Sequence, residues 1–407
     1  MTKYWKNLDF QSPKTDLRTE ILVVGAGIFG STVAIELSRR GYKTTLLDEG
    51  LAPNPLAAST DISKVIRMEY GRDPQYAEMV AESIVGFRLW NDEFGQELYH
   101  ETGVVSLSTT PMNPGGFEHD SYETLRKQGF DLTRLNSEEI TKRFPALKKG
   151  VYVDGIFNPV GGFAESGKIL SQLYQKARSA GVNRVADRLQ SLISTNSRVT
   201  GVQLTSGSSI GADHVVLATG AWTPIILPEL ADFMVVTGHP VFHLRIDDPK
   251  LFSPPLLPTF LTDVARTGWY GFPYHPDEHV LKLGNHGVGR LLHPEHDERV
   301  LDDVDIKAMR QFLESTFPSL VDAPVVYTRL CLYCDCHDEH FWIDRHPVME
   351  GLTVAAGGSG HAFKFAPILG TLIADAVEQI PNAWLPRFAW RNLTERVQGE
   401  EAARYRG

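Results

Sequence analysis

A glycine-rich turn between two apolar segments constrains the fold of this chain more than any other feature. The segment 19–24, TEILVV, is short, apolar and rich in β-branched residues, which is typical of a buried strand. GAGIFG follows it and puts Gly25, Gly27 and Gly30 in G-x-G-x-x-G spacing. STVAIELSRRGY then has apolar residues at helical spacing, and KTTLLDEG is a second strand. Together these segments predict a βαβ unit.

The three glycines have different physical roles in a turn that binds a dinucleotide. The first allows a tight turn, the second lets the backbone approach a pyrophosphate at the helix N-terminus, and the third lets helix and strand pack closely. Asp48 ends the second strand, about 20 residues further on, where a carboxylate accepts the ribose hydroxyls. A glycine turn in a purely structural βαβ unit is the alternative, but the acidic residue favours a dinucleotide. The motif does not separate NAD from FAD.

Two later segments favour FAD. VVLATGAW (215–222), which contains Gly220, resembles the strand-to-turn segment of flavoproteins of the two-dinucleotide type. LTVAAGGSG (352–360), which contains Gly358, resembles the last flavin-contacting strand of the same group. For each segment alone, a glycine that merely ends a buried strand is the alternative. In combination with the first motif, they predict FAD.

Length and composition limit the class of protein. A chain of 407 residues is longer than most single-core domains, so we expect two domains. The formal net charge of -10 argues against nucleic acid as a partner. No apolar run is long enough to span a bilayer, and the polar N-terminus lacks the apolar region of a secretory signal. With three cysteines and no peroxisomal tripeptide at the end, a cytoplasmic location is expected.

The order of helix and strand patterns along the chain indicates a discontinuous domain. Residues 1–17 form a polar arm, 76–95 and 164–181 have the pattern of helices, and 226–330 has the short alternating runs of an antiparallel sheet. Strand, glycine turn and helix return near residue 352. We therefore predict an α/β (α+β two-domain) fold, with a Rossmann-like FAD-binding domain interleaved with an antiparallel β-sheet substrate domain. The expected ranges are 18–92, 150–225 and 330–407 for the first domain, and 93–149 and 226–329 for the second.

With these residues identified, the chain resembles the monomeric sarcosine oxidase family. This is a branch of the D-amino-acid-oxidase-like flavoproteins that includes pipecolate, saccharopine and fructosyl amino acid oxidases. The resemblance runs from about residue 18 to residue 390. The segments that carry it are VVGAGIFGSTVAIELSRRGYKTTLLD, SKVIRMEYG, ETGVVSLS, LATGAW, LKLGNH, CLYCDCHDEHFWIDRHP and AAGGSGHAFKF.

The resemblance implies an enzyme that oxidises the C–N bond of a secondary amino acid. FAD accepts a hydride equivalent, an imine forms, and O₂ reoxidises the cofactor and yields hydrogen peroxide. The expected partners are a small amine or amino acid and O₂, with neither nucleic acid nor membrane, and the family is often monomeric. Three alternatives stay open. They are a fructosyl amino acid oxidase, a tailoring oxidase whose imine cyclises within a natural product, and a flavin dehydrogenase that passes electrons to another protein.

All three cysteines lie in RLCLYCDCHDEHF (329–341). The resemblance implies that Cys331 anchors FAD through a thioether to the 8α carbon, with Cys334 and Cys336 as neighbours. The competing interpretation is a zinc site, because C-x-x-C-x-C followed by H-x-x-H offers five ligands. Structural zinc sites usually take two ligand pairs from separate elements, and a redox pair favours a helix N-terminus. No metal is therefore predicted.

Two further residues are implied to act near the reacting centre. Lys282, in LKLGNH, matches a lysine near flavin N5 that assists oxygen reduction, where a fixed cation stabilises a developing anion. Strand alternation alone favours solvent for Lys282, because Leu281 and Leu283 flank it. His286 matches a histidine of the substrate cavity, and the nearby position is acidic in fructosyl amino acid oxidases, which disfavours a sugar-bearing substrate.

Four further residues complete the implied site. Arg67 and Lys364 match the pair that binds the substrate carboxylate, Arg as a bidentate fork and Lys as a point charge. A surface ion pair for Arg67, and a solvated position for Lys364 in the first turn of the last helix, are the structural alternatives. Lys64 falls close to the flavin ring, and Tyr333 matches a tyrosine that lines the pocket, unless it is an ordinary core aromatic. The GGSGH turn would put Gly358 and a positive helix end at the flavin pyrimidine.

Overall fold

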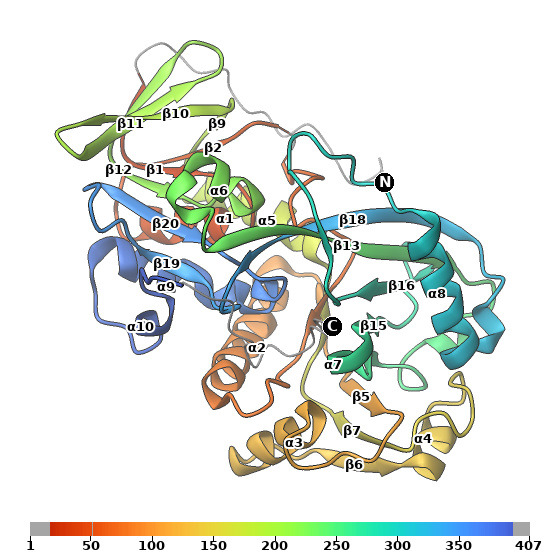
Figure 1. Ribbon diagram of the computed structural model, residues 1–407. Helices are drawn as coiled ribbons and strands as arrows, with labels where there is room; N and C mark the ends of the chain where they lie inside the picture. The colour runs from red at the N-terminus through yellow and green to blue at the C-terminus, as the bar shows by residue number, and fades with distance from the viewer. Residues whose placement is uncertain (1–16, 51, 394–407) are drawn as a thin grey trace.

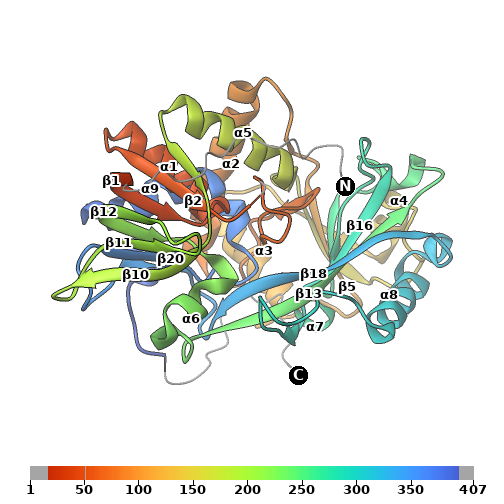
Figure 2. The same cartoon turned by 90° about the horizontal axis from the view of Figure 1, so that it is seen from above.

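The computed structural model describes residues 17–50 and 52–393, and Figure 1 shows its ribbon. The polar arm predicted for residues 1–17 lies outside the described residues except at Leu17, which begins the first strand. Two large sheets dominate. In Figure 2 the first lies on the left and the second on the right, and the long strands β13 and β18 extend between them.

The first sheet has eight strands and carries the predicted βαβ unit. β1 is parallel to β2 on one side and to β12 on the other, and β12 is also parallel to β20. The order is β10 (Leu189–Thr195), β11 (Arg198–Leu204), β12 (Ser209–Leu217), β1 (Leu17–Val24), β2 (Thr44–Asp48) and β9 (Asn183–Ala186), with β20 (Leu352–Ala356) beside β12 and β19 (Trp342–Arg345) beside β20.

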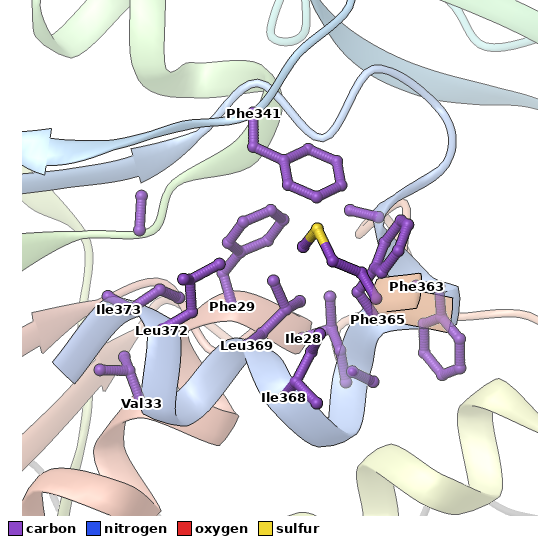
Figure 3. Close-up of a cluster of buried hydrophobic side chains, with 14 of the residues drawn as sticks. Ile28, Phe29, Val33, Phe341, Phe363, Phe365, Ile368, Leu369, Leu372 and Ile373 are labelled. Atoms are coloured by element: carbon purple, nitrogen blue, oxygen red, sulfur yellow. The ribbon is translucent and has the colours of Figure 1, made fainter. Parts of the chain in front are cut away.

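Helices cover this sheet through a shared apolar layer. α1 (Ile28–Arg39) packs against α5 (Ser166–Ser179) and α9 (Ala366–Glu378) and lies on β1, β2 and β20. Figure 3 shows how side chains from α1 and α9 meet Phe341 and the short 3₁₀ turn η5 (Ala362–Phe365) that precedes α9. The buried side chains labelled there are Ile28, Phe29, Val33, Phe341, Phe363, Phe365, Ile368, Leu369, Leu372 and Ile373.

The second sheet has nine strands, and most of its pairs are antiparallel. Its order is β17 (Arg290–Leu291), β13 (Met234–Arg245), β16 (Val280–Asn285), β15 (Trp269–Gly271), β14 (Thr259–Thr262), β5 (Val104–Ser108), β7 (Asp154–Asn158) and β6 (Thr133–Asn136), with β18 (Val325–Cys336) paired to β13. A third, three-stranded sheet joins β3 (Lys64–Ile66), β8 (Gly162–Ala164) and β4 (Tyr99–His100).

Two of the remaining helices, α2 (Pro74–Phe94) and α8 (Asp303–Thr316), begin at residues whose side chains cap a helix N-terminus. α2 begins where the Asp73 carboxylate accepts two backbone N–H groups, and it ends at Gly95 in the left-handed region. α8 starts with a capping box between Asp302 and Asp305. The other helices are α3 (Phe117–Lys127), α4 (Ser137–Arg143), α6 (Thr223–Ile226), α7 (Val264–Thr267) and α10 (Leu385–Phe388).

The predicted fold class is confirmed, because a Rossmann-like parallel part stands beside a largely antiparallel sheet. α8 falls within the stretch expected to be antiparallel sheet, so that expectation was incomplete. β7 and β18 both belong to the nine-stranded sheet. All of β7 and most of β18, however, fall in ranges predicted for the FAD-binding domain. The domain boundaries stay a prediction. Over the described ranges, no helix is both long enough and apolar enough to cross a membrane.

Candidate active site

A cavity of about 870 Å³ lies where the carboxyl ends of the parallel strands meet the second sheet. This edge is where open α/β sheets bind their ligands. Most of the predicted site residues line it, and three do not border it. Those that line it are Gly25, Gly27, Asp48, Lys64, Arg67, Gly220, His286, Tyr333, Gly358 and Lys364, whereas Gly30, Lys282 and Cys331 lie behind its wall.

The turn after β1 needs its glycines. Gly25 has φ +98°, and a Cβ there would lie 2.5 Å from the carbonyl oxygen of Ala218. A Cβ on Gly30 would lie 1.8 Å from the carbonyl oxygen of Gly25, so any side chain would push α1 away from β1. Gly27 caps α1 and borders the cavity. The N-terminal end of α1 therefore faces the cavity with backbone N–H groups, which fits a pyrophosphate.

Asp48 joins this turn to the end of β2. Its Oδ2 accepts a hydrogen bond from the backbone N–H of Ala26 at 2.7 Å, and Asn54 Nδ2 lies 3.5 Å from its Oδ1. Burial raises the pKa of Asp48, although these hydrogen bonds oppose the rise. The carboxylate is fixed at the cavity wall, as an acceptor of ribose hydroxyls must be.

Two other backbone turns border the same cavity. Gly220 begins a 3₁₀ turn after β12 with φ +52°, and Gly358 follows β20. A Cβ on Gly358 would lie 3.2 Å from Ala362 and 3.4 Å from the Phe29 ring, so this turn packs closely on α1. Lys364 belongs to η5, and α9 begins only at Ala366. The structural alternative for Lys364, a solvated position in the first turn of the helix, is therefore wrong, because Lys364 is buried and precedes α9.

Arg67 and Lys364, which both line the cavity, converge on one buried tyrosine. Lys364 Nζ donates to the Tyr70 hydroxyl at 2.7 Å, and Arg67 Cζ lies 5.0 Å from the centroid of the same ring. Arg67 and Lys364 are each 4% exposed, so neither is a surface cation. Arg67 also lies 5.7 Å from the ring of Phe117. Two buried cations border one cavity, which is an arrangement that suits a carboxylate.

His286 and Tyr333 lie together on the side of the second sheet. His286 Nδ1 is 3.4 Å from the Tyr333 hydroxyl. His239, which the sequence did not indicate, stacks on the Tyr333 ring with centroids 3.9 Å apart. Tyr270 lines the cavity as well, and burial raises its pKa. Tyr333 is therefore a wall residue of the cavity held between two histidines.

Lys282 is buried, contrary to the expectation from strand alternation. It is 1% exposed, because residues on both faces of β16 are buried. Its Nζ lies 2.9 Å from Asp61 Oδ2, donates to the Ser63 carbonyl, and lies 4.7 Å from the centroid of Phe272, a cavity-lining ring. Burial lowers the pKa of Lys282 to about 8, and Asp61 opposes that fall.

Asp61 is a buried carboxylate that the sequence reading missed. Its Oδ2 is also 3.5 Å from Lys64 Nζ, and its Oδ1 is 3.7 Å from His243 Nε2. Burial alone would raise the pKa of Asp61, but Lys282 and Lys64 hold it well below the ordinary value. Asp61 lies three residues before Lys64, and no local motif distinguishes it.

The three cysteines face two different environments because side chains alternate along β18. Cys331 packs with Tyr333, whereas Cys334 and Cys336 belong to the core behind the first sheet. Burial raises the pKa of Cys334 to about 12. Burial also acts against ionisation of Cys331, but Lys64 and Arg329 outweigh it and lower its pKa. Among residues 17–50 and 52–393, no three His, Cys, Asp or Glu side chains form a metal-binding group.

Comparisons with known proteins agree with this geometry. The family described as FAD dependent oxidoreductase matches residues 20–376. L-saccharopine oxidase of Schizosaccharomyces pombe is 29% identical over 91% of this chain and 93% of its own. Monomeric sarcosine oxidase of a Bacillus species is 26% identical over 87% and 91%. Amadoriase I of Aspergillus fumigatus, a fructosyl amine:oxygen oxidoreductase, superimposes with a TM-score of 0.77 at 25% identity, over 92% and 90%.

Proposed function

The chain belongs to the family of FAD-dependent oxidoreductases, and we propose that it oxidises the C–N bond of an N-substituted or cyclic secondary amino acid, with O₂ as acceptor and an imine and hydrogen peroxide as products. One observation carries this proposal. Arg67 and Lys364, two buried cations, line the cavity that the dinucleotide turn at Gly25 also lines. The proposed cofactor site and the proposed carboxylate site thus share one cavity.

The cofactor-binding roles follow from the donors present. FAD supplies the two-electron oxidation when bound. The Gly25–Gly30 turn and Asp48 are proposed to bind its pyrophosphate and ribose, and Gly220 and Gly358 to contact it through the backbone. Lys64 is proposed to lie near its ring. Cys331 is proposed to form the thioether to the 8α carbon, because a lowered thiol pKa favours the nucleophilic thiolate. The C–S bond would replace an 8α C–H bond and the thiol S–H bond, and the two electrons released would pass through the flavin to O₂, the proposed acceptor.

The substrate-binding roles follow from charge. Arg67 and Lys364 are proposed to bind the carboxylate, since charge-assisted hydrogen bonds from buried cations are the strong ones. His286 and Tyr333 are proposed to border the amine. Lys282 is proposed to assist the reaction with O₂ as a fixed cation. We also propose that the enzyme is a cytoplasmic monomer with the two interleaved domains described above.

The names of the relatives support this substrate class. Those names refer to saccharopine, sarcosine and fructosyl amines. Each is a secondary amine. A fructosyl amino acid oxidase is the second candidate, favoured by the superposition on amadoriase I.

A peroxide-coupled screen tests the proposal. Purified enzyme is supplied in air with sarcosine, pipecolate, proline, saccharopine, fructosyl amino acids and N-methyl aromatic amino acids, and hydrogen peroxide is measured. We expect peroxide from at least one secondary amino acid and much less from its methyl ester at the same concentration. An enzyme that reduces a dye anaerobically but makes no peroxide is a dehydrogenase. Colourless purified protein with no activity on any of these compounds contradicts the proposal.

A further inference from the structure

We propose that Asp61 is a positioning residue that keeps Lys282 protonated and fixed beside the cavity for the reaction with O₂. The inference rests on the proposed function, because it assigns Asp61 a part in the role proposed for Lys282. Asp61 does not border the cavity, so it acts through Lys282 rather than on substrate or cofactor.

Asp61 is held in place through both its backbone carbonyl and its carboxylate. Its own carbonyl accepts hydrogen bonds from Ser166 Oγ at 2.9 Å and from the Gly167 backbone N–H at 2.8 Å, at the start of α5. The backbone N–H of Ile62 donates to Oδ1 at 2.8 Å. Oδ2 is thereby left toward β16, where Lys282 lies 2.9 Å away. A carboxylate pinned in this way restricts where the ammonium of Lys282 can lie.

The contacts of Lys282 show what this restriction achieves. Its ammonium has three N–H groups and no acceptor. Asp61 Oδ2 and the Ser63 carbonyl are hydrogen-bond partners on the side away from the cavity. The same nitrogen lies 4.7 Å from the Phe272 ring, which lines the cavity. The ammonium of Lys282 is therefore held next to the Phe272 ring, which lines the cavity where substrate and cofactor are proposed to meet.

Charge is the second part of the argument. A lysine buried without a partner loses its proton, because a dry site disfavours the ammonium. The groups within electrostatic reach of Asp61 and Lys282 come from several strands. They are Lys64, His243, Tyr270, Tyr327, Arg329 and Cys331. Lys64 and Arg329 repel the ammonium of Lys282, and Asp61 is the carboxylate that offsets them.

A purely structural ion pair is the competing explanation. Loss of the carboxylate would then weaken folding without changing how the reaction with O₂ depends on pH. The two explanations differ in the midpoint of the pH profile, because only the positioning role ties that midpoint to Asp61.

The experiment compares Asp61→Asn with wild type, Lys282→Met and a matched control, Asp154→Asn. Asp154 is a buried aspartate paired with Arg134 at 2.6 Å, away from the cavity. Reoxidation of substrate-reduced enzyme by O₂ is followed by stopped flow across about pH 4–10. In wild type the rate should fall as pH rises through about 8, where Lys282 loses its proton.

In Asp61→Asn the midpoint should move down by about 1–3 pH units, the usual effect of a close opposite charge. Reoxidation at about pH 7 should then fall about 2- to 100-fold toward the Lys282→Met rate, according to the size of the shift, and recover in acid. Lys282→Met should be slow at every pH, and Asp154→Asn should keep the wild-type midpoint. Asp61→Glu, which retains the charge, should restore much of the wild-type profile.

A second readout does not depend on turnover. Lysine labelled with ¹³C at Cε is followed by NMR in the purified enzyme, and the signal absent from Lys282→Met identifies Lys282. Its titration should move to lower pH in Asp61→Asn. If Asp61→Asn does not fold, Lys64→Met is used instead. It removes a repelling cation, so the Lys282 signal should titrate at higher pH.

The outcomes separate the two proposals. If Lys282→Met reoxidises slowly while Asp61→Asn keeps the wild-type midpoint and NMR titration, the role of Asp61 is wrong and that of Lys282 stands. If Lys282→Met reoxidises like wild type, the oxygen role of Lys282 in the proposed function is wrong, whatever the NMR titration gives.

Discussion

Arg329 Nη2 lies 3.2 Å from Cys331 Sγ, in the middle of β18. Lys64 Nζ lies 4.0 Å from the same sulfur. Two cations beside one thiol stabilise the thiolate against the cost of burial and lower the pKa of Cys331. Cys334 and Cys336, by contrast, have raised pKa values because burial disfavours their thiolates. Within this segment, the charge around the sulfur distinguishes one cysteine from the other two.

The first prediction follows from this difference. Cys331→Ser should release FAD when the protein is denatured in acid, because serine cannot form the thioether. Cys334→Ser and Cys336→Ser are the matched controls, and both should leave yellow denatured protein and a fluorescent gel band. Peptide mass mapping of wild type should find the mass of FAD on the fragment that contains Cys331. An unmodified fragment from yellow enzyme would show that the anchor is elsewhere.

The second prediction concerns the cation pair around Tyr70. Lys364→Met should raise the apparent KM for an amino acid substrate about 10- to 100-fold, since a hydrogen bond to a charged group contributes about 1.5–3 kcal/mol. The methyl ester of the substrate should lose the same interaction in wild type. Steady-state kinetics on acid and ester, for wild type and variant, measure both. Equal activity on acid and ester in wild type would count against carboxylate binding by this pair.

The third prediction concerns Arg329. Arg329→Met should keep the fold but raise the pKa of the Cys331 thiol, because it removes a cation 3.2 Å from the sulfur. The fraction of protein with covalently bound FAD should then fall at neutral pH and recover at higher pH, where the thiol ionises. Absorbance of the acid-precipitated pellet at several incubation pH values reports that fraction. A fraction equal to that of wild type at every pH would remove Arg329 from the attachment.

The Gly25–Gly30 turn shows what the sequence could predict. Close backbone contacts require glycine at Gly25 and Gly30, so a six-residue pattern between a strand and a helix was enough to predict the parallel sheet and the edge where the cavity lies. The prediction was less accurate near the end of the chain, where it did not place the start of α9. Pro367 occupies the first turn of α9, a position proline favours, and this signal marks a helix start after Lys364.

Lys282 and Asp61 show why other features could not be predicted. Strand alternation correctly put Lys282 on the face opposite Leu281 and Leu283, but both faces of β16 are buried, and the second face is covered by contacts from distant segments such as that of Asp61. Asp61 and Lys282 are in contact although more than 200 residues separate them in the sequence. The hydrogen bond from Lys282 Nζ to the Ser63 carbonyl spans a similar separation. Contacts of that range leave no periodic pattern in the sequence.

The fourth prediction concerns folding stability in acid. His214 on β12 is buried, and its Nε2 lies 2.8 Å from Thr353 Oγ1 of β20. Burial, with help from Arg345 and Arg198, lowers its pKa from 6.5 to about 4. Between these values the unfolded chain binds a proton that the folded chain does not. The contribution of His214 to the free energy of unfolding is therefore complete above about pH 6.5 and is lost as pH falls toward about 4.

The size of this effect follows from the shift. At 1.36 kcal/mol per pH unit, His214 accounts for about 3 kcal/mol of acid sensitivity. His214→Gln should be less stable than wild type at neutral pH, because it disturbs a packed site, and the difference should shrink by about 3 kcal/mol on going from about pH 7 to about pH 4. Urea unfolding at a series of pH values measures it. His296→Gln, at an exposed position, is the control and should follow the wild-type curve. A constant difference between His214→Gln and wild type across this range would mean that His214 does not titrate with unfolding.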